Sequence, residues 1–442
     1  ANRGSISTGY DIDNSLKFEA DNNESLSKTL SSDGNKQTWT VSCWVKRTEL
    51  ANQMIFAAQD TYLYFVDNKI RINTRNDLTN YFFETAALFR DTSAWYHCVV
   101  AVDTTNSTAS ERTRVYVNGV EYSSTNTTYT NNSYGTRWND STRTQRIGKY
   151  DTGINFSGYL AEFHSIDGQQ LAPTDFGEYD DDSGIWKPKA YTGSYGSKGF
   201  YLDFSDSANL GDDASGNSNN FTENNITAAD QATDTPTNNG CTLNVLASLE
   251  GSNDITEGAL VSTGKAGGGG NFNGTYGTIG IDPFNSSVDW YWEIETSIGT
   301  SGSTTDIGIG WIKESRITSG STIYSDVYGD GISRYSSQTA NAAGDIWGVL
   351  LETGTTPVFK LYRNDSLIHT STHGSGGVSF DTLMFPYITV KGTSVDARLN
   401  FLNPASSFSI ASGNADPNGY GNFEFDPKGG YALCTKNLAE YG

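Results

Sequence analysis

A histidine stands beside a cysteine at His97–Cys98, inside the segment WYHCVVAVD (residues 95–103). An imidazole next to a thiol could activate a nucleophile or supply half of a metal site. The surrounding residues are aromatic and β-branched, however, which is typical of a strand. Because successive side chains of a strand point to opposite faces of its sheet, His97 and Cys98 are predicted to point apart. They are therefore interpreted as strand residues and not as a catalytic pair.

The other cysteines are Cys43, Cys241 and Cys434, and the chain has neither a CxxC motif nor a Cys/His spacing typical of a metal site. Cys43 and Cys98 lie in apolar segments, where a free thiol acts as a small hydrophobic side chain. A disulfide between Cys43 and Cys98 is the alternative.

A polar loop at residues 124–145 combines groups that bind sugars. Sugar recognition uses exposed aromatic faces for stacking, and amides or carboxylates for the hydroxyls. The candidate carbohydrate-binding residues of this loop are Tyr129, Tyr134, Trp138, Asn139 and Asp140. The alternative is that Trp138 folds back under its own loop or contacts a neighbouring subunit.

Oxygen-bearing side chains also follow the predicted strand GFYLDF (residues 199–204). The candidate Ca²⁺ ligands are Asp203, Asp206, Asp212, Asp213 and Asn217. Calcium binds about six to eight oxygens, but the spacing is not that of an EF-hand. Ca²⁺ is the one cofactor that the sequence suggests, and solvated loop carboxylates are the alternative.

The elements that must position these groups are short strands. The chain has 442 residues with 47 glycines, 9 prolines and 18% charged residues, and apolar runs with a helical period are nearly absent. Short alternating runs bounded by Gly, Asn, Asp and Ser predict antiparallel sandwiches, and Asn118-Gly119 predicts a type I′ hairpin turn. A single core stops growing at about 250–300 residues, so two domains are expected.

Four segments of the first half occur in the order of a known family. They are SLKF (15–18), TWTVSCWVK (38–46), WYHCVVAVD followed by VYVNG (115–119), and FSGYLAEFHSIDGQQL (156–171). This order resembles the LamG-type, concanavalin A-like lectin domain over roughly residues 5–180. The resemblance implies a two-sheet jelly roll that binds carbohydrate or packs against protein, often with a Ca²⁺ at its rim.

A different ordered set fills the second half, with DWYWEIETSIG (289–299), GDIWGVLLETG (344–354), VFKLYRNDSLIHTS (358–371) and LMFPYITV (383–390). This order resembles the SPRY domain, a β-sandwich that binds protein partners through loops at one end. The expected organisation is a LamG-like jelly roll with an added strand over residues 1–225, a linker and entry over 226–257, and a SPRY-like sandwich with a tail over 258–442. The expected fold class is all-β, with two antiparallel β-sandwiches of the jelly-roll type in tandem.

Two carboxylates, Glu293 and Glu295, share one face of the predicted strand DWYWEIETSIG. Glycosidases use such a pair as acid and nucleophile, and laminarinase-type enzymes of the concanavalin-like fold carry a third acid two residues further along. Position 297 is Ser297 in this chain. A polysaccharide hydrolase is therefore the least favoured interpretation, and the protein is not expected to be an enzyme.

The net charge of −22 argues against binding to nucleic acid or to an anionic membrane. No segment has the roughly 20 apolar residues that span a bilayer, and the first residues, ANRGSISTGY, lack the features of a signal peptide. No nucleic-acid partner and no membrane insertion are expected.

The junction at residues 180–245 resembles in style the structural proteins of marine bacteriophages. Together with two recognition folds, this resemblance implies a virion structural protein, such as a tail fibre, head fibre, spike or capsid-decorating component, at the virion surface. Its expected partners are a host-surface glycan or receptor, other virion proteins and further copies of itself. A trimer is favoured, because multivalency strengthens weak sugar binding by about 10²–10⁴. The alternative is an extracellular lectin or adhesin, secreted or on a bacterial cell surface.

Overall fold

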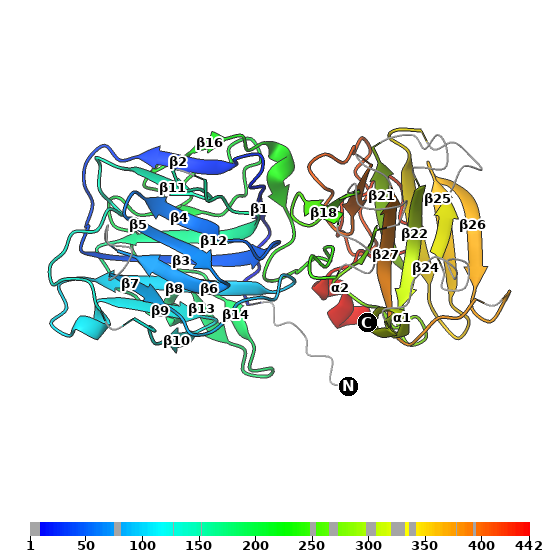
Figure 1. Cartoon of the computed structure of the whole chain (residues 1–442), viewed down its shortest axis with the longest axis horizontal. Coiled ribbons are helices and arrows are strands. Elements are labelled where there is room, and N and C mark those ends of the chain that lie inside the picture. Colours follow the sequence, from blue (N-terminus) through cyan, green and yellow to red (C-terminus); the bar gives the residue numbers. More distant parts are fainter. Residues whose placement is uncertain are drawn as a thin grey trace. The chain divides into compact units, whose positions relative to one another are not determined.

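The computed structural model describes residues 9–74, 81–126, 128–151, 153–247, 253–264, 273–297, 306–319, 332–335, 342–376, 378–391 and 395–442. Within them the chain consists almost entirely of antiparallel strands and loops, so the all-β prediction is confirmed. The chain forms two compact units, one at Ser7–Thr237 and one that contains Asn238–Gly442 (Figure 1). None of the described helices is long and apolar enough to cross a membrane.

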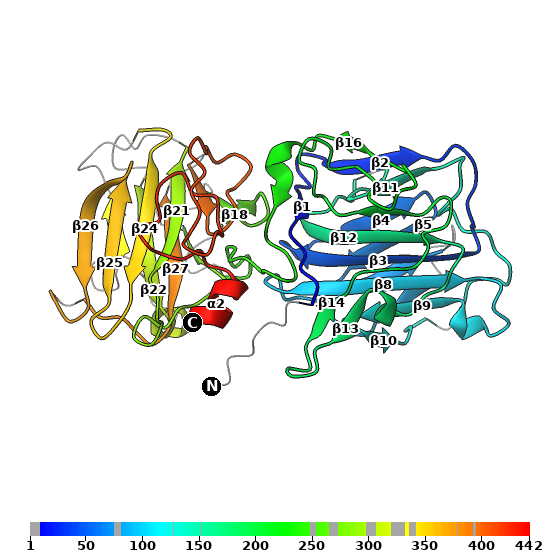
Figure 2. The same ribbon diagram turned by 180° about the vertical axis from the view of Figure 1, so that it is seen from behind.

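The first unit is a sandwich of two sheets, which Figures 1 and 2 show from opposite sides. In spatial order, the first sheet contains β10 (Val120–Tyr122), β9 (Thr113–Val117), β8 (Trp95–Asp103), β3 (Thr38–Arg47), β12 (Gly158–Asp167), β1 (Ser15–Phe18) and β17 (Gln231–Ala232), and β15 (Phe200–Leu202) also pairs with β12. The second sheet contains β16 (Thr222–Asn224), β2 (Ser25–Thr29), β11 (Thr144–Ile147), β4 (Gln53–Ala58), β5 (Thr61–Val66), β6 (Lys69–Asn73) and β7 (Phe82–Glu84). The shorter elements are β13 (Gly177–Tyr179), β14 (Trp186–Pro188), η1 (Ala109–Glu111), η2 (Pro173–Asp175) and η3 (Ala228–Asp230).

The core of the first unit lies between the two sheets because apolar residues alternate along their strands. Cys98 of β8 belongs to this core and lies opposite Cys43 of β3. His97, the preceding residue, is buried against Trp44 and Trp186, which are not part of this core. The predicted divergence of His97 and Cys98 is therefore confirmed, and all four cysteines are free thiols.

The predicted hairpin at Asn118-Gly119 is confirmed. Both residues have positive φ, 49° and 79°, and Val117 pairs with Val120 across the turn, as a type I′ turn requires. A Cβ atom on Gly119 would lie 2.5 Å from the indole ring of Trp186. This position therefore needs glycine for its backbone conformation and for the close approach of β14.

The first unit continues beyond residue 225, where a linker was expected. β16 pairs with β2, and β17 pairs with β1. Ile226 and Ala232 are buried, so residues 226–237 contribute to the first sandwich because they add strand pairing and apolar surface to it. Cys241 and Leu243 belong to the core of the second unit.

The second unit also contains two sheets. One has the spatial order β18 (Asn253–Thr256), β19 (Val261–Gly264), β28 (Asp396–Asn400), β21 (Trp290–Thr296), β24 (Ile346–Glu352), β25 (Val358–Arg363) and β26 (Ser366–Thr372). The other has the order β20 (Asn273–Tyr276), β27 (Met384–Lys391), β22 (Asp306–Lys313) and β23 (Ile332–Tyr335), and the helices are α1 (Glu314–Ser319) and α2 (Thr435–Tyr441). Trp290, Trp292, Trp311 and Trp347 are buried in the core of this unit.

Candidate functional site

The structure separates the five predicted sugar-binding residues of the loop 124–145. Tyr129 is 42% exposed, and Tyr134 is half-buried. Trp138, Asn139 and Asp140 are buried, so they present no face to a sugar in solution. The prediction of an exposed tryptophan in this loop is therefore wrong, and the alternative that Trp138 folds under its own loop is confirmed.

Trp138 is a core residue with an exposure of 0%. Its ring centroid lies 4.5 Å from that of Phe56 and 6.4 Å from that of Phe200. Its indole N–H donates to the Ser165 hydroxyl at 3.0 Å, which satisfies the one polar group of the side chain. Burying the large aromatic surface of Trp138 is favourable even though its neighbours in the sequence are polar. The sequence of the loop alone does not reveal this burial, because the packing partners come from other strands.

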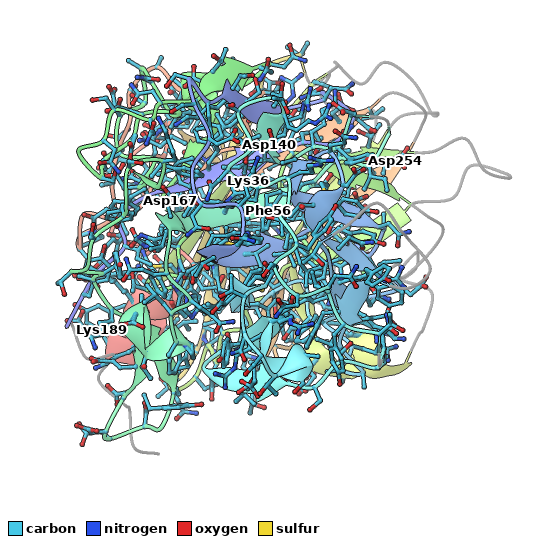
Figure 3. All side chains as sticks on the ribbon, turned by 90° about the vertical axis from the view of Figure 1, so that its left-hand side faces the viewer. Lys36, Phe56, Asp140, Asp167, Lys189 and Asp254 are labelled. Atoms are coloured by element: carbon cyan, nitrogen blue, oxygen red, sulfur yellow. The ribbon has the colours of Figure 1, made fainter. Side chains whose placement is uncertain are left out.

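Asn139 and Asp140 hold the loop in place. Figure 3 views the end of the first unit where Lys36, Asp140 and Asp167 lie. Asn139 has φ of 64° and donates to the Asn35 carbonyl at 3.2 Å. Asp140 accepts the Thr142 N–H at 3.0 Å and forms an ion pair with Arg137 at 3.2 Å. These contacts are within the loop or to its neighbours, which makes both residues structural.

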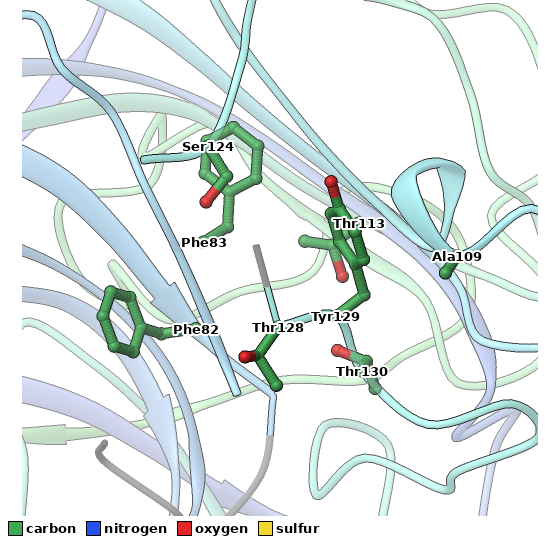
Figure 4. Close-up of a pocket in the computed structure, with 8 residues that line it drawn as sticks. All are labelled: Phe82, Phe83, Ala109, Thr113, Ser124, Thr128, Tyr129 and Thr130. Atoms are coloured by element: carbon green, nitrogen blue, oxygen red, sulfur yellow. The ribbon is translucent and has the colours of Figure 1, made fainter. Parts of the chain in front are cut away.

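Tyr129 lies at a pocket between the loop and the edge of the second sheet. The described residues that line it are Phe82, Phe83, Ala109, Thr113, Ser124, Thr128, Tyr129 and Thr130 (Figure 4). They come from β7, from η1 and the start of β9, and from the loop that follows β10. The cavity volume is about 20 Å³, about the room of one water molecule, so a larger ligand can rest only at the mouth of the pocket. We refer to it as the β7 pocket.

Hydrogen bonds to neighbouring segments fix the loop side of the β7 pocket. Ser124 forms a bridge with Thr85, and the Thr125 N–H donates to the Glu84 carbonyl at 2.8 Å. At the other end, the Thr130 hydroxyl hydrogen-bonds the Thr74 hydroxyl, and the Thr130 carbonyl accepts a hydrogen bond of 2.9 Å from Arg112. Tyr129 is therefore presented on a segment that is tied down on both sides, which limits the entropy lost when a ligand binds.

Ion pairs fix the β7 side of the pocket. Glu84 forms ion pairs with Arg71 and Lys69, the latter at 3.0 Å. Burial opposes ionisation, but the hydrogen bonds from Arg71 and Lys69 hold the pKa of Glu84 below its usual range. The Arg71 guanidinium lies 4.4 Å from the ring centroid of Phe82, a distance at which a cation attracts an aromatic face. Phe82 is therefore held at its position in the pocket wall.

The lining combines three aromatic rings with four hydroxyl-bearing residues besides Tyr129. Among the described residues, the Thr113 hydroxyl is buried and has no hydrogen-bond partner. A buried polar group without a partner costs about 1–3 kcal/mol.

The predicted Ca²⁺ ligands do not form a cluster. Within the described part of the chain, no three His, Cys, Asp or Glu side chains are placed to hold a metal ion. Asp213, the buried member, accepts the N–H groups of Tyr201 and Ser215, each at 2.9 Å, and of Asn219 at 2.7 Å. Asp203 and Asp206 each accept the backbone N–H of the residue two positions further along the chain. Asp212 accepts a hydrogen bond from the side-chain amide of Asn220, and the side-chain amide of Asn217 donates to the carbonyls of Gly196 and Gly199. The oxygens order turns, which agrees with the alternative of loop carboxylates, and the described residues do not gather these side chains into a Ca²⁺ site.

The carboxylates of the hydrolase alternative are also structural. Glu293 is buried and accepts the N–H groups of Glu424 at 2.8 Å and Phe425 at 2.9 Å. Glu295 is buried and accepts the N–H of Ser409 at 2.7 Å. Both side chains therefore attach the segment after β28 to the sheet, and neither is presented to a polysaccharide.

His97 has a structural environment as well. The Trp186 indole N–H donates to His97 Nδ1 at 2.9 Å, and Nε2 lies 2.8 Å from the Ser42 hydroxyl. Burial lowers the pKa of His97 to about 3, and burial raises the pKa of Cys98 to about 12. At neutral pH both are therefore uncharged, and the thiolate that chemistry would need is absent.

Sequence reasoning identified Tyr129 but not the residues that face it. Phe82, Phe83 and Thr113 are separated from Tyr129 by up to 47 positions and become neighbours only through sheet pairing. The signal that could have been used is the aromatic triplet Tyr81-Phe82-Phe83 after a polar stretch.

Residues 8–169 match the family model of the concanavalin A-like lectin/glucanases superfamily. The lectin-like resemblance of the first unit is thereby confirmed, and the β7 pocket lies within the matched segment. No curated protein matches the chain.

Several solved structures are similar to parts of this chain. A heptameric SAP-like pentraxin from Limulus polyphemus is 18% identical over 37% of this chain and 80% of its own, with a TM-score of 0.28. A proposed carbohydrate-binding protein from Bacteroides ovatus is 16% identical over 51% of this chain and 60% of its own, with a TM-score of 0.36. A human SPRY domain is 15% identical over 32% of this chain and 90% of its own, with a TM-score of 0.22.

Proposed function

We propose that the first unit is a non-catalytic carbohydrate-binding module and that the sugar rests on the exposed Tyr129 ring at the mouth of the β7 pocket. The observation that carries this proposal is Tyr129, an exposed ring at a pocket lined by hydroxyls, within the segment that matches the lectin family. The apolar face of a sugar ring packs on an aromatic side chain, while its hydroxyls need polar partners. The β7 pocket offers both.

Binding rather than catalysis is supported by the positions of the carboxylates. Glu84, an acidic residue of β7 next to the pocket, is engaged by Arg71 and Lys69. Glu293 and Glu295 are buried and accept backbone N–H groups. Glycoside hydrolysis requires an acid and a second carboxylate on the two sides of the scissile bond, and these three side chains are committed elsewhere.

The test is a glycan-binding assay on the full chain and two tyrosine variants of the same loop. Tyr129→Ala removes the exposed ring and should abolish retention on a glycan array. Tyr134→Ala is the matched control, because Tyr134 does not line the pocket, and it should bind like the unchanged protein. Equal retention of all three proteins would contradict the assignment of the site.

We further propose that the protein works at a virion surface, as a fibre, spike or capsid-decorating component that presents this module to a host glycan or receptor. The net charge of −22 and the division into two sandwiches support a surface-displayed recognition protein. A homo-oligomer, with a trimer favoured, would multiply weak sugar affinity by about 10²–10⁴. An extracellular lectin or adhesin is favoured equally by the family match.

Immunogold labelling of intact particles separates these two settings. Gold on the particles would support the virion proposal. Gold confined to cell surfaces or the medium would reject it in favour of the adhesin. Light scattering on the purified protein tests the oligomer, and a monomer at micromolar concentration would contradict it.

A further inference from the structure

We propose that β26 (Ser366–Thr372) of the second unit is an assembly surface, and that it pairs in an antiparallel manner with β26 of a second copy of this chain. Such pairing joins two copies around a two-fold axis and continues the sheet of one copy into that of the other. The inference rests on the homo-oligomer of the proposed function. It assigns that oligomer an interface and a two-fold symmetry, in place of the trimer that multivalency alone favours.

β26 differs in length from the other strands at sheet ends. It is the last strand of the larger sheet of the second unit, and Figures 1 and 2 both show it at the free end of that sheet. It has seven residues, whereas the strands at the seven other ends of the four larger sheets have two to four residues each. A very short edge strand is one way in which proteins prevent pairing with other chains. β26 lacks that protection.

The outer side of β26 offers backbone groups for hydrogen bonding. Within the part of the chain that the structure describes, β26 pairs with β25 alone. Alternate N–H and C=O groups of an edge strand point away from its one neighbour, so their partners must come from water or from another strand. A strand added at this edge would satisfy these groups with a regular ladder of hydrogen bonds.

The strand carries no charge that would oppose pairing. Its sequence, SLIHTST, contains no Asp, Glu, Lys, Arg or Pro, and burial lowers the pKa of His369, so the imidazole is neutral at pH 7. The charged side chains of β25 and of the turn that follows it all form ion pairs, which are Lys360–Glu352, Arg363–Asp345 and Asp365–Lys428. Neutrality matters here because each copy has a net charge of −22, and like charges opposite each other across two strands are destabilising.

Two adjacent apolar side chains of β26 are exposed. Leu367 is 53% exposed and Ile368 is 40% exposed. The register with β25 shifts at Ile368, which is the extra residue of a bulge. A bulge can protect an edge, but this one leaves both apolar side chains in solvent. Burying them against a second copy is favourable, and at a two-fold interface each side chain contributes twice.

A second copy of β26 is the occupant that these features fit. A strand that pairs at this edge must be neutral, partly apolar and long enough to form a ladder. Among the described strands at the ends of the larger sheets, β26 alone has seven residues and no charged side chain. An antiparallel pair of identical strands is also self-complementary, because the contact of residue i with residue j is repeated as that of residue j with residue i.

The experiment measures the mass of the full chain by light scattering, at concentrations that rise through the micromolar range. We expect the unchanged protein to form a dimer, and we expect hydrogen exchange of the β26 amides to slow as the dimer forms. Leu367→Lys should weaken the dimer about 30-fold or more, because two-fold symmetry makes one substitution act twice. Leu88→Lys is the matched control, since Leu88 is a leucine of the first unit that is 45% exposed, and it should form the dimer as the unchanged protein does.

The outcomes separate this inference from the proposed function. A dimer that is equally strong in Leu367→Lys, or β26 amides whose exchange does not depend on concentration, overturns the β26 interface. A trimer overturns the two-fold pairing and supports the trimer of the proposed function. A chain that stays monomeric overturns both the pairing and the homo-oligomer, and leaves carbohydrate binding to the glycan array. Unfolding temperatures of the two variants close to that of the unchanged protein show that a lost dimer does not come from a lost fold.

Discussion

Replacing Trp138 by alanine should damage stability and not recognition. The indole is fully buried against Phe56, Trp39 and Phe200. Trp→Ala substitutions in a core cost about 3–5 kcal/mol because they remove apolar contacts and leave a cavity. The Ser165 hydroxyl would also lose the indole N–H that it now accepts. For a unit of this size, such a loss lowers the unfolding temperature by roughly 6–20 °C.

Differential scanning calorimetry of the full chain measures this effect, because each unit has its own core and the transition of the first unit should move alone. Tyr129→Ala provides the opposite signature. An exposed side chain changes stability by about 0.5 kcal/mol or less, so its unfolding temperature should stay constant while glycan binding is lost. Binding by Trp138→Ala, measured well below its lowered unfolding temperature, should be close to that of the unchanged protein.

The reasoning is refuted if Trp138→Ala loses glycan binding while its unfolding temperature stays within about 2 °C. That result would mean that Trp138 contacts the ligand and that its burial in the core does not describe the protein in solution. Trp138→Phe refines the test, since it retains an aromatic ring in the core and should recover a large part of the lost stability.

Three further predictions concern the cores of the two units. Burial raises the pKa of Glu293 to about 7, so the protonated side chain stabilises the second unit most below about pH 4.5, and this stabilisation is lost as pH rises through 7. Calorimetry between pH 5 and 8 should show the unfolding temperature of the second unit falling with pH, and Glu293→Gln should flatten that dependence. All four cysteines are buried, so a thiol reagent should label none of them in the native protein and all of them in denaturant, and rapid native labelling would contradict their burial. Gly119→Ala should lower the unfolding temperature more than Gly184→Ala, because both have positive φ but only the Cβ at 119 meets a ring, that of Trp186 at 2.5 Å; equal effects would show that the contact is unimportant.

The strands of the first unit could be predicted because their signals are local. The side chains of the segment 95–103 point alternately to the two faces of their sheet, as expected for a strand of this composition. Asn118-Gly119 adopts the turn that those two residues favour. The same locality explains why His97 and Cys98 could be separated without a structure. The contribution of residues 226–237 was missed, because a two-residue strand such as β17 has no periodic signal of its own and depends on pairing with β1.

The sequence by itself determined the alternation that makes the chain all-β, the order of segments that places it near a lectin family, and the absence of a local motif for metal or nucleophile chemistry. Only the tertiary structure decided which polar-looking residues are accessible. Trp138 and Tyr129 lie nine positions apart in one polar loop, yet one completes a core with Phe56 and the other lies at a pocket with Phe82. Burial depends on partners from distant strands, and a linear pattern of one loop contains no information about those partners.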